Sequence, residues 1–68
     1  MKAIKEYIEE KGITQRDFAR LCGIHEMTIS FLIDERRIPT TENLLRIHFA
    51  TGISYEDLFK DISFTNKE

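Results

Sequence analysis

The chain has 68 residues, of which 41% are hydrophobic and 32% charged, and its formal net charge is −2. This length allows one domain, and the composition excludes a disordered chain or a membrane span, since no apolar run approaches the ~18 residues that a bilayer requires. The charges interleaved through MKAIKEYIEEKG predict an amphipathic helix rather than a signal peptide, and a single cysteine, Cys22, favours a reducing cytoplasm.

A six-residue phrase recurs three times along the chain, and each copy predicts the start of a helix. The copies are ITQRDF at 13–18, IHEMTI at 24–29 and ISYEDL at 53–58. In the first and third copies a Thr or Ser can cap the backbone N–H three residues on, where an Asp can complete a capping box. His25 takes the same place in the second copy and is an unusual cap.

Stop signals lie where these starts require them. Gly12, Gly23 and Gly52 each precede one of the phrases, where a left-handed residue closes a helix, and Pro39 ends the third segment, after which Thr40 or Thr41 can cap another helix. The sequence therefore predicts an all-α fold with five helices, at 2–11, 14–22, 25–35, 41–51 and 54–60.

Apolar residues at helical spacing predict the core of this fold. The expected core includes Ile4, Tyr7, Ile8, Phe18, Leu21, Cys22, Ile29, Leu32, Leu44, Leu45, Ile47, Leu58 and Phe59. We expect one domain at 1–60 and a tail at 61–68. Ile62 and Phe64 alternate with polar residues in the tail, which is either frayed or a short strand that pairs with a second chain.

Only the sequence CGI separates the helices expected at 14–22 and 25–35, which predicts a helix-turn-helix. Ala19, Gly23, Ile29, Pro39 and the closing GISYEDLF resemble, in type and spacing, the lambda repressor/Cro-like (XRE-type) helix-turn-helix family over about residues 4–59. The resemblance implies a five-helix DNA-binding domain, with no cofactor, that inserts the helix at 25–35 into the major groove of double-stranded DNA.

The same resemblance assigns roles to individual residues. It places Gln15 at a DNA phosphate, Glu26, Met27 and Phe31 at base edges, and His25 and Thr28 near the DNA backbone. A helical wheel independently puts the base-edge residues on one face with Ser30 and Asp34, opposite the apolar side of the helix.

This face carries no Lys or Arg, so two interpretations stay open. If this face reads the groove, Glu26 would accept a hydrogen bond from cytosine N4, and Ser30 would bond either kind of base edge. Met27 and Phe31 would pack on thymine methyls. Phosphate contacts would then come from Arg16, Arg36 and Arg37, with Arg20 a weaker candidate. As a protein-binding adaptor or antitoxin-like module, the chain would use Met27 and Phe31 as an exposed apolar pair.

Other chemistry finds little support. His25, His48 and Cys22 lack paired metal-ligand spacing, so we expect no metal site, and no residues make a catalytic triad or phosphate loop. Phe49 is an aromatic residue where the family usually has a polar one. Either its helix is rotated to bury it, or Phe49 forms a homodimer interface with Ile62 and Phe64. We expect a cytoplasmic transcriptional regulator, most simply a repressor.

Overall fold

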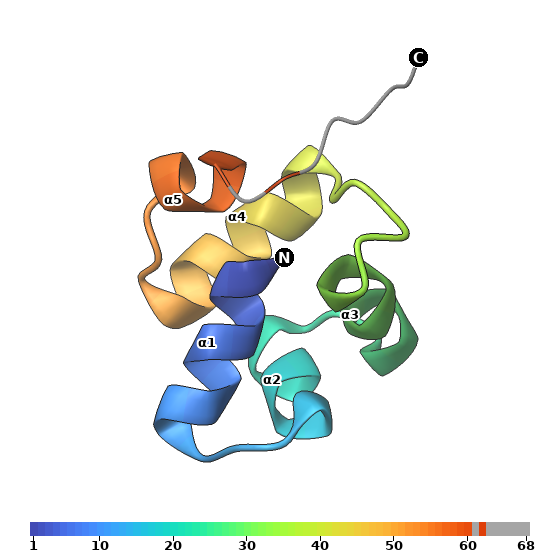
Figure 1. The fold of residues 1–68 in the computed structure, drawn as a ribbon, viewed down its shortest axis with the longest axis vertical. Helices are drawn as coiled ribbons and strands as arrows, with labels where there is room; N and C mark the ends of the chain where they lie inside the picture. Colours follow the sequence, from blue (N-terminus) through green and yellow to red (C-terminus); the bar gives the residue numbers. More distant parts are fainter. Residues whose placement is uncertain (61, 63–68) are drawn as a thin grey trace.

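The computed structural model describes residues 1–60 and 62, and these residues form the five helices that the sequence predicts. They are α1 (Lys2–Lys11), α2 (Gln15–Cys22), α3 (Glu26–Ile33), α4 (Thr41–Thr51) and α5 (Tyr55–Lys60). Figure 1 shows α1 running from the middle of the molecule to its lower left, with α2 and α3 to its right and α4 and α5 above and to the left of it.

The helix starts follow the capping signals of the sequence. The Asp17 N–H donates to Thr14 Oγ1 at 3.0 Å and the Thr14 N–H donates to Asp17 Oδ2 at 3.2 Å, which completes a capping box. The bond from the Thr14 backbone, and then the one with its side chain, hold the pKa of the Asp17 carboxyl below its ordinary value. Thr40 Oγ1, rather than Thr41, caps α4 by accepting from the Asn43 N–H at 3.1 Å.

The end of α3 corrects the predicted boundary at residue 35, because the helix stops at Ile33. Glu35 takes a left-handed φ of 61°, its N–H donates to the Leu32 carbonyl at 3.2 Å, and the Arg36 N–H donates to the Phe31 carbonyl at 2.8 Å. This pair of hydrogen bonds is a Schellman motif, in which the left-handed residue is usually glycine. Because no glycine marks this stop, the sequence pattern predicted a helix end two residues too late.

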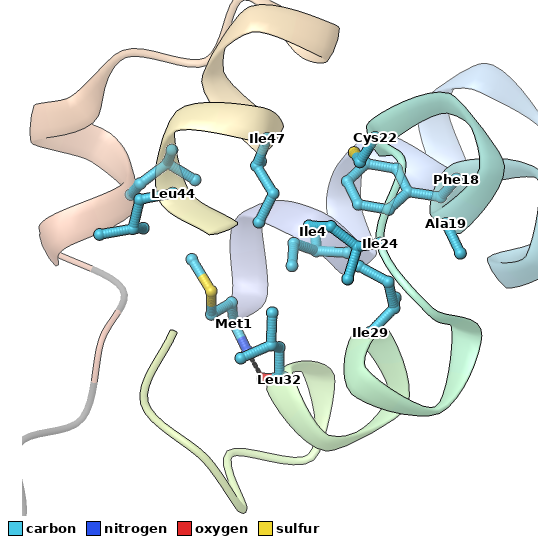
Figure 2. Close-up of a cluster of buried hydrophobic side chains, with 11 residues drawn as sticks. Met1, Ile4, Phe18, Ala19, Cys22, Ile24, Ile29, Leu32, Leu44 and Ile47 are labelled. Carbon is cyan, nitrogen blue, oxygen red and sulfur yellow. Dashed lines mark hydrogen bonds between the residues drawn. The ribbon is translucent and has the colours of Figure 1, made fainter. Parts of the chain in front are cut away.

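One core unites the helices. In Figure 2 apolar side chains from α1 to α4 meet at its centre, and Leu58 of α5 completes the cluster. The buried hydrophobic residues are Met1, Ile4, Phe18, Ala19, Cys22, Ile24, Ile29, Leu32, Leu44, Ile47 and Leu58. The amino group of Met1 donates to the carbonyl oxygens of Leu32 and Ile33 at the end of α3. The N-terminus of the chain therefore lies against the C-terminal end of α3.

Three expectations about the core are wrong. Leu21 and Phe59 are 51% and 53% exposed, because α2 and α5 are short and turn only a narrow stripe inward. At 100° per residue each of these two side chains falls outside the arc that its helix buries. Leu45 is also exposed.

Candidate nucleic-acid interface

The turn between α2 and α3 fixes the angle at which α3 leaves the fold. Gly23 has a φ of 70°, and the N–H groups of Gly23 and Ile24 donate to the carbonyls of Arg20 and Ala19 at 3.3 and 3.0 Å. Ile24 and Ala19 are both buried, so the turn is anchored on the core beneath it (Figure 2). A side chain larger than Ala19 at this crossing would push the two helices apart.

Arg46 of α4 supports this turn from outside, a role that sequence reasoning missed. Its guanidinium donates to Glu42 Oε2 at 2.8 and 3.2 Å and to the Gly23 carbonyl at 3.4 Å. A Cβ added at Gly23 would lie 3.0 Å from Arg46 Nη1, so glycine also leaves room for the arginine. The i, i+4 spacing of Glu42 and Arg46 predicts their ion pair. The contact with Gly23 spans 23 residues and has no local signal in the sequence.

His25 caps α3 as the sequence suggested. Its Nδ1 accepts from the Met27 N–H at 3.1 Å, and an accepting Nδ1 places the neutral ring's proton on Nε2. The ring is exposed and can therefore donate outward from Nε2 while it caps the helix. This is the chemistry that a contact to a phosphate oxygen requires.

Five of the predicted DNA-contacting residues lie together around one shallow hollow of about 310 Å³. Gln15 of α2 lines it beside His25, Glu26, Met27 and Ser30 at the start of α3. Helix α2 thus brings Gln15, the expected phosphate contact, next to the expected base-reading residues. Met27 is 60% exposed.

Glu26 has a cationic partner that lies outside its own helix. Arg16 Nε of α2 lies 3.5 Å from Glu26 Oε1, and both side chains are largely exposed. An exposed pair of this kind adds little stability, about 0–1 kcal/mol. Its electrostatic effect is of greater interest, because Arg16 offsets the acidic charge at the start of α3.

Phe31 departs from the exposed apolar pair that the sequence suggested. Its side chain is half-buried, and Cζ of Arg37 lies 4.7 Å from the centroid of its ring. Arg36 and Arg37 are both exposed in the turn that follows α3, and Thr28 is half-buried in the helix. The α3 face therefore has an arginine beside each end, although none lies on the face itself.

The residues predicted for the dimer interface, Phe49, Ile62 and Phe64, differ in their exposure to solvent or lie outside the described residues. Phe49 is 78% exposed, which excludes the alternative in which α4 rotates to bury it, and its ring makes an edge contact with His48. Ile62 is half-buried and packs against the core of its own chain, and Phe64 lies outside the described residues.

Cys22 and His48 make contacts within the fold. Burial raises the pKa of the Cys22 thiol to about 11, so the thiolate is scarce near neutral pH. His48 Nδ1 lies 2.7 Å from the Ile53 carbonyl, and its ring stacks on Tyr55. Across residues 1–60 and 62, no cluster of three His, Cys, Asp or Glu side chains is placed to hold a metal ion, and no helix combines the length and apolarity of a membrane span.

The helix-turn-helix family model (HTH_3) matches residues 4–58, which is most of the chain. The chain belongs to the lambda repressor/Cro-like helix-turn-helix family. Membership of this family suggests DNA binding, and helix-turn-helix domains of this type are generally non-enzymatic. No curated protein and no solved structure matches the chain.

Proposed function

We propose that this helix-turn-helix domain is a sequence-specific transcriptional regulator of the cytoplasm that binds double-stranded DNA with α3 in the major groove. The observation that carries the proposal is the hollow that brings Gln15 of α2 beside His25, Glu26, Met27 and Ser30 of the α3 start. A helix-turn-helix needs this juxtaposition, because the first helix contacts the backbone while the second reads bases.

Base reading in this proposal belongs to the start of α3, where Glu26 and Met27 are exposed and Ser30, one turn on, is half-buried. Glu26 accepts from cytosine N4, Met27 packs on a thymine methyl, and Ser30 bonds a neighbouring base edge. Such contacts select a sequence, but most of the affinity has to come from phosphate contacts.

Phosphate contacts come from residues around the same face. They are Gln15, Arg16, His25, Thr28, Arg36 and Arg37. The Arg16–Glu26 pair also supports the proposal, since the acid that faces the groove is offset by a cation within 3.5 Å. The net charge of −2 therefore does not describe the surface that meets DNA.

The regulator acts as a homodimer on a partly palindromic operator, with half-sites about 34 Å apart. Phe49 supports this part of the proposal, because an aromatic ring that is 78% exposed gains free energy when a second surface covers it. In the same proposal the domain spans 1–60, and the tail at 61–68 adds to the interface Phe64 and the part of Ile62 that the core of its own chain leaves exposed. A protein that occupies the operator excludes other proteins from it, so repression is the simplest mode of action.

Capture of a protein by Met27 and Phe31, as in an adaptor or antitoxin, has less support. Met27 is exposed, but Phe31 is half-buried and its ring lies under the Arg37 guanidinium, so Phe31 offers less apolar surface to a partner than the adaptor requires.

The salt dependence of binding to a mixed-sequence DNA duplex tests DNA binding itself. The logarithm of the association constant should fall linearly with the logarithm of salt concentration, by about 0.9 for each phosphate that a cation neutralises. Arg36→Ala should reduce this slope by roughly 1. Fluorescence anisotropy at several salt concentrations measures both slopes.

The control is Lys60→Ala, which removes a cation from α5, away from the α2–α3 face. It should leave the slope nearly unchanged. Absence of binding to any duplex at low salt contradicts the proposal. Salt-insensitive capture of a protein that is lost in Met27→Ala would support the adaptor instead.

A further inference from the structure

Phe31 makes two contacts with the turn that carries the arginines Arg36 and Arg37. The Phe31 carbonyl accepts from the Arg36 N–H at 2.8 Å, and the Phe31 ring lies under the Arg37 guanidinium, with 4.7 Å between Cζ and the ring centroid. Glu35 has a left-handed backbone, and its N–H donates to the Leu32 carbonyl. This conformation sets the direction in which the chain leaves α3 on its way to Arg36 and Arg37. Phe31 thus connects α3 to the arginines beyond its end.

Stacking on an aromatic ring restrains arginine in a way that an exposed salt bridge does not. The planar guanidinium is weakly hydrated and favours the face of an aromatic ring, while its N–H groups at the edge stay free to donate. A free arginine side chain loses considerable rotamer entropy when it binds a phosphate, and a side chain that is already restrained loses less. The Phe31 ring therefore lowers the cost of ordering Arg37.

The same contact competes with direct reading of a base by Phe31. The face of the Phe31 ring that the guanidinium covers is closed to a thymine methyl, and the Phe31 side chain is half-buried, which leaves little of the ring for a base. We infer that Phe31 is a positioning residue that holds Arg37 for contact with the DNA backbone, and that Glu26, Met27 and Ser30 alone read bases. This inference rests on the proposed function, because it concerns how the same surface grips DNA.

A thermodynamic cycle with Phe31→Leu, Arg37→Ala and the double variant tests this role. Leucine keeps an apolar side chain at position 31 but has no ring face. The affinity for a duplex selected by the wild-type chain should fall about two- to fivefold in Phe31→Leu, the range expected for an exposed cation–π contact. The same substitution should have no further effect in the Arg37→Ala background.

Base preference and rescue separate positioning from reading. Phe31→Leu should weaken all duplexes alike and leave the preferred base at every position unchanged. Phe31→Tyr should bind like the wild-type chain, because it keeps the ring. Arg37→Lys should bind more weakly, because a compact ammonium lacks the planar face. Thermal unfolding of each variant, measured alongside, identifies any loss of binding that is due to loss of fold.

Two outcomes overturn the inference while leaving the proposed function intact. The first is an equal loss in Phe31→Leu with and without Arg37, together with a changed preference at one base position, which would make Phe31 a reader. The second is unchanged affinity in Phe31→Leu. If the wild-type chain binds no duplex at low salt, the proposed function fails and this inference fails with it.

Discussion

At the scale of single residues, Glu26 shows how a neighbour on another helix changes what a side chain can do. An acid that faces a groove is repelled by phosphates, and the sequence places no Lys or Arg on the same face of α3. The structure puts Arg16 Nε of α2 3.5 Å from its carboxylate. A helical wheel compares residues of one helix only, so the pair could not be derived from the pattern.

Among the residues that the structure describes, Glu35 is the one non-glycine residue with a positive φ. This conformation lowers the free energy of unfolding by a measurable amount. A left-handed backbone costs a residue with a Cβ about 1–2 kcal/mol, whereas glycine adopts it freely. Part of this gain is lost because glycine is more flexible in the unfolded chain. Glu35→Gly should therefore stabilise the protein by roughly 1 kcal/mol, which raises the melting temperature by about 4–8 °C in a domain of this size.

The matched control is Glu35→Ala, which removes the same carboxylate but keeps the Cβ and its strain. Thermal unfolding followed by circular dichroism should show a higher melting temperature for the glycine variant than for the alanine variant. Equal melting temperatures for the two would mean that the left-handed turn stores no strain.

At the scale of helices, the starts were predictable because their signals are local. Thr14 with Asp17, Thr40 with Asn43 and Ser54 with Asp57 each make the capping hydrogen bond within three residues that the sequence indicated. The glycine stops at 12, 23 and 52 are also confirmed, since all three residues have positive φ. Such signals depend on a few consecutive residues, so they can be read without knowing how the helices pack.

Features that depend on packing between helices were harder to predict. Leu21 and Phe59 follow the apolar spacing of a core residue, yet each helix buries a stripe too narrow to include them. The contact of Arg46 with the Gly23 carbonyl and that of Arg37 with the Phe31 ring join elements whose relative positions the sequence does not state. The sequence thus predicted that Glu26, Met27 and Asp34 are exposed on α3 and at its C-cap, but not the contacts that Arg16 and Arg37 make with residues of this helix.

At the scale of the whole molecule, the exposed phenylalanines Phe49 and Phe59 lie on other helices than the arginines that flank α3. Arg16, Arg36 and Arg37 surround the exposed face of α3, whereas Phe49 lies on α4 and Phe59 on α5. Figure 1 shows α5 on the opposite side of the molecule from α2 and α3. A second copy that covered Phe49 would leave α3 of both copies free to meet DNA.

Phe49→Ser tests the proposed dimer. The wild-type chain should sediment as a dimer at micromolar concentrations, and the variant as a monomer with unchanged helix content, because Phe49 is 78% exposed and contributes little to the fold. Sedimentation equilibrium measures the mass directly.

Leu21→Ser is the matched control, since it also removes an exposed apolar side chain but from α2. Its mass should equal that of the wild-type chain. A wild-type monomer at all concentrations up to the millimolar range would refute dimerisation through Phe49.

The central claim is that the start of α3 reads DNA sequence, and selection from a pool of random duplexes tests it most directly. The wild-type chain should enrich one motif, and Glu26→Gln should change the preferred base at one position, from cytosine towards adenine. Arg36→Ala should enrich the same motif with lower affinity, because a phosphate contact carries no sequence information. Enrichment of no motif, or of the same motif by the wild-type chain and Glu26→Gln, would contradict the claim.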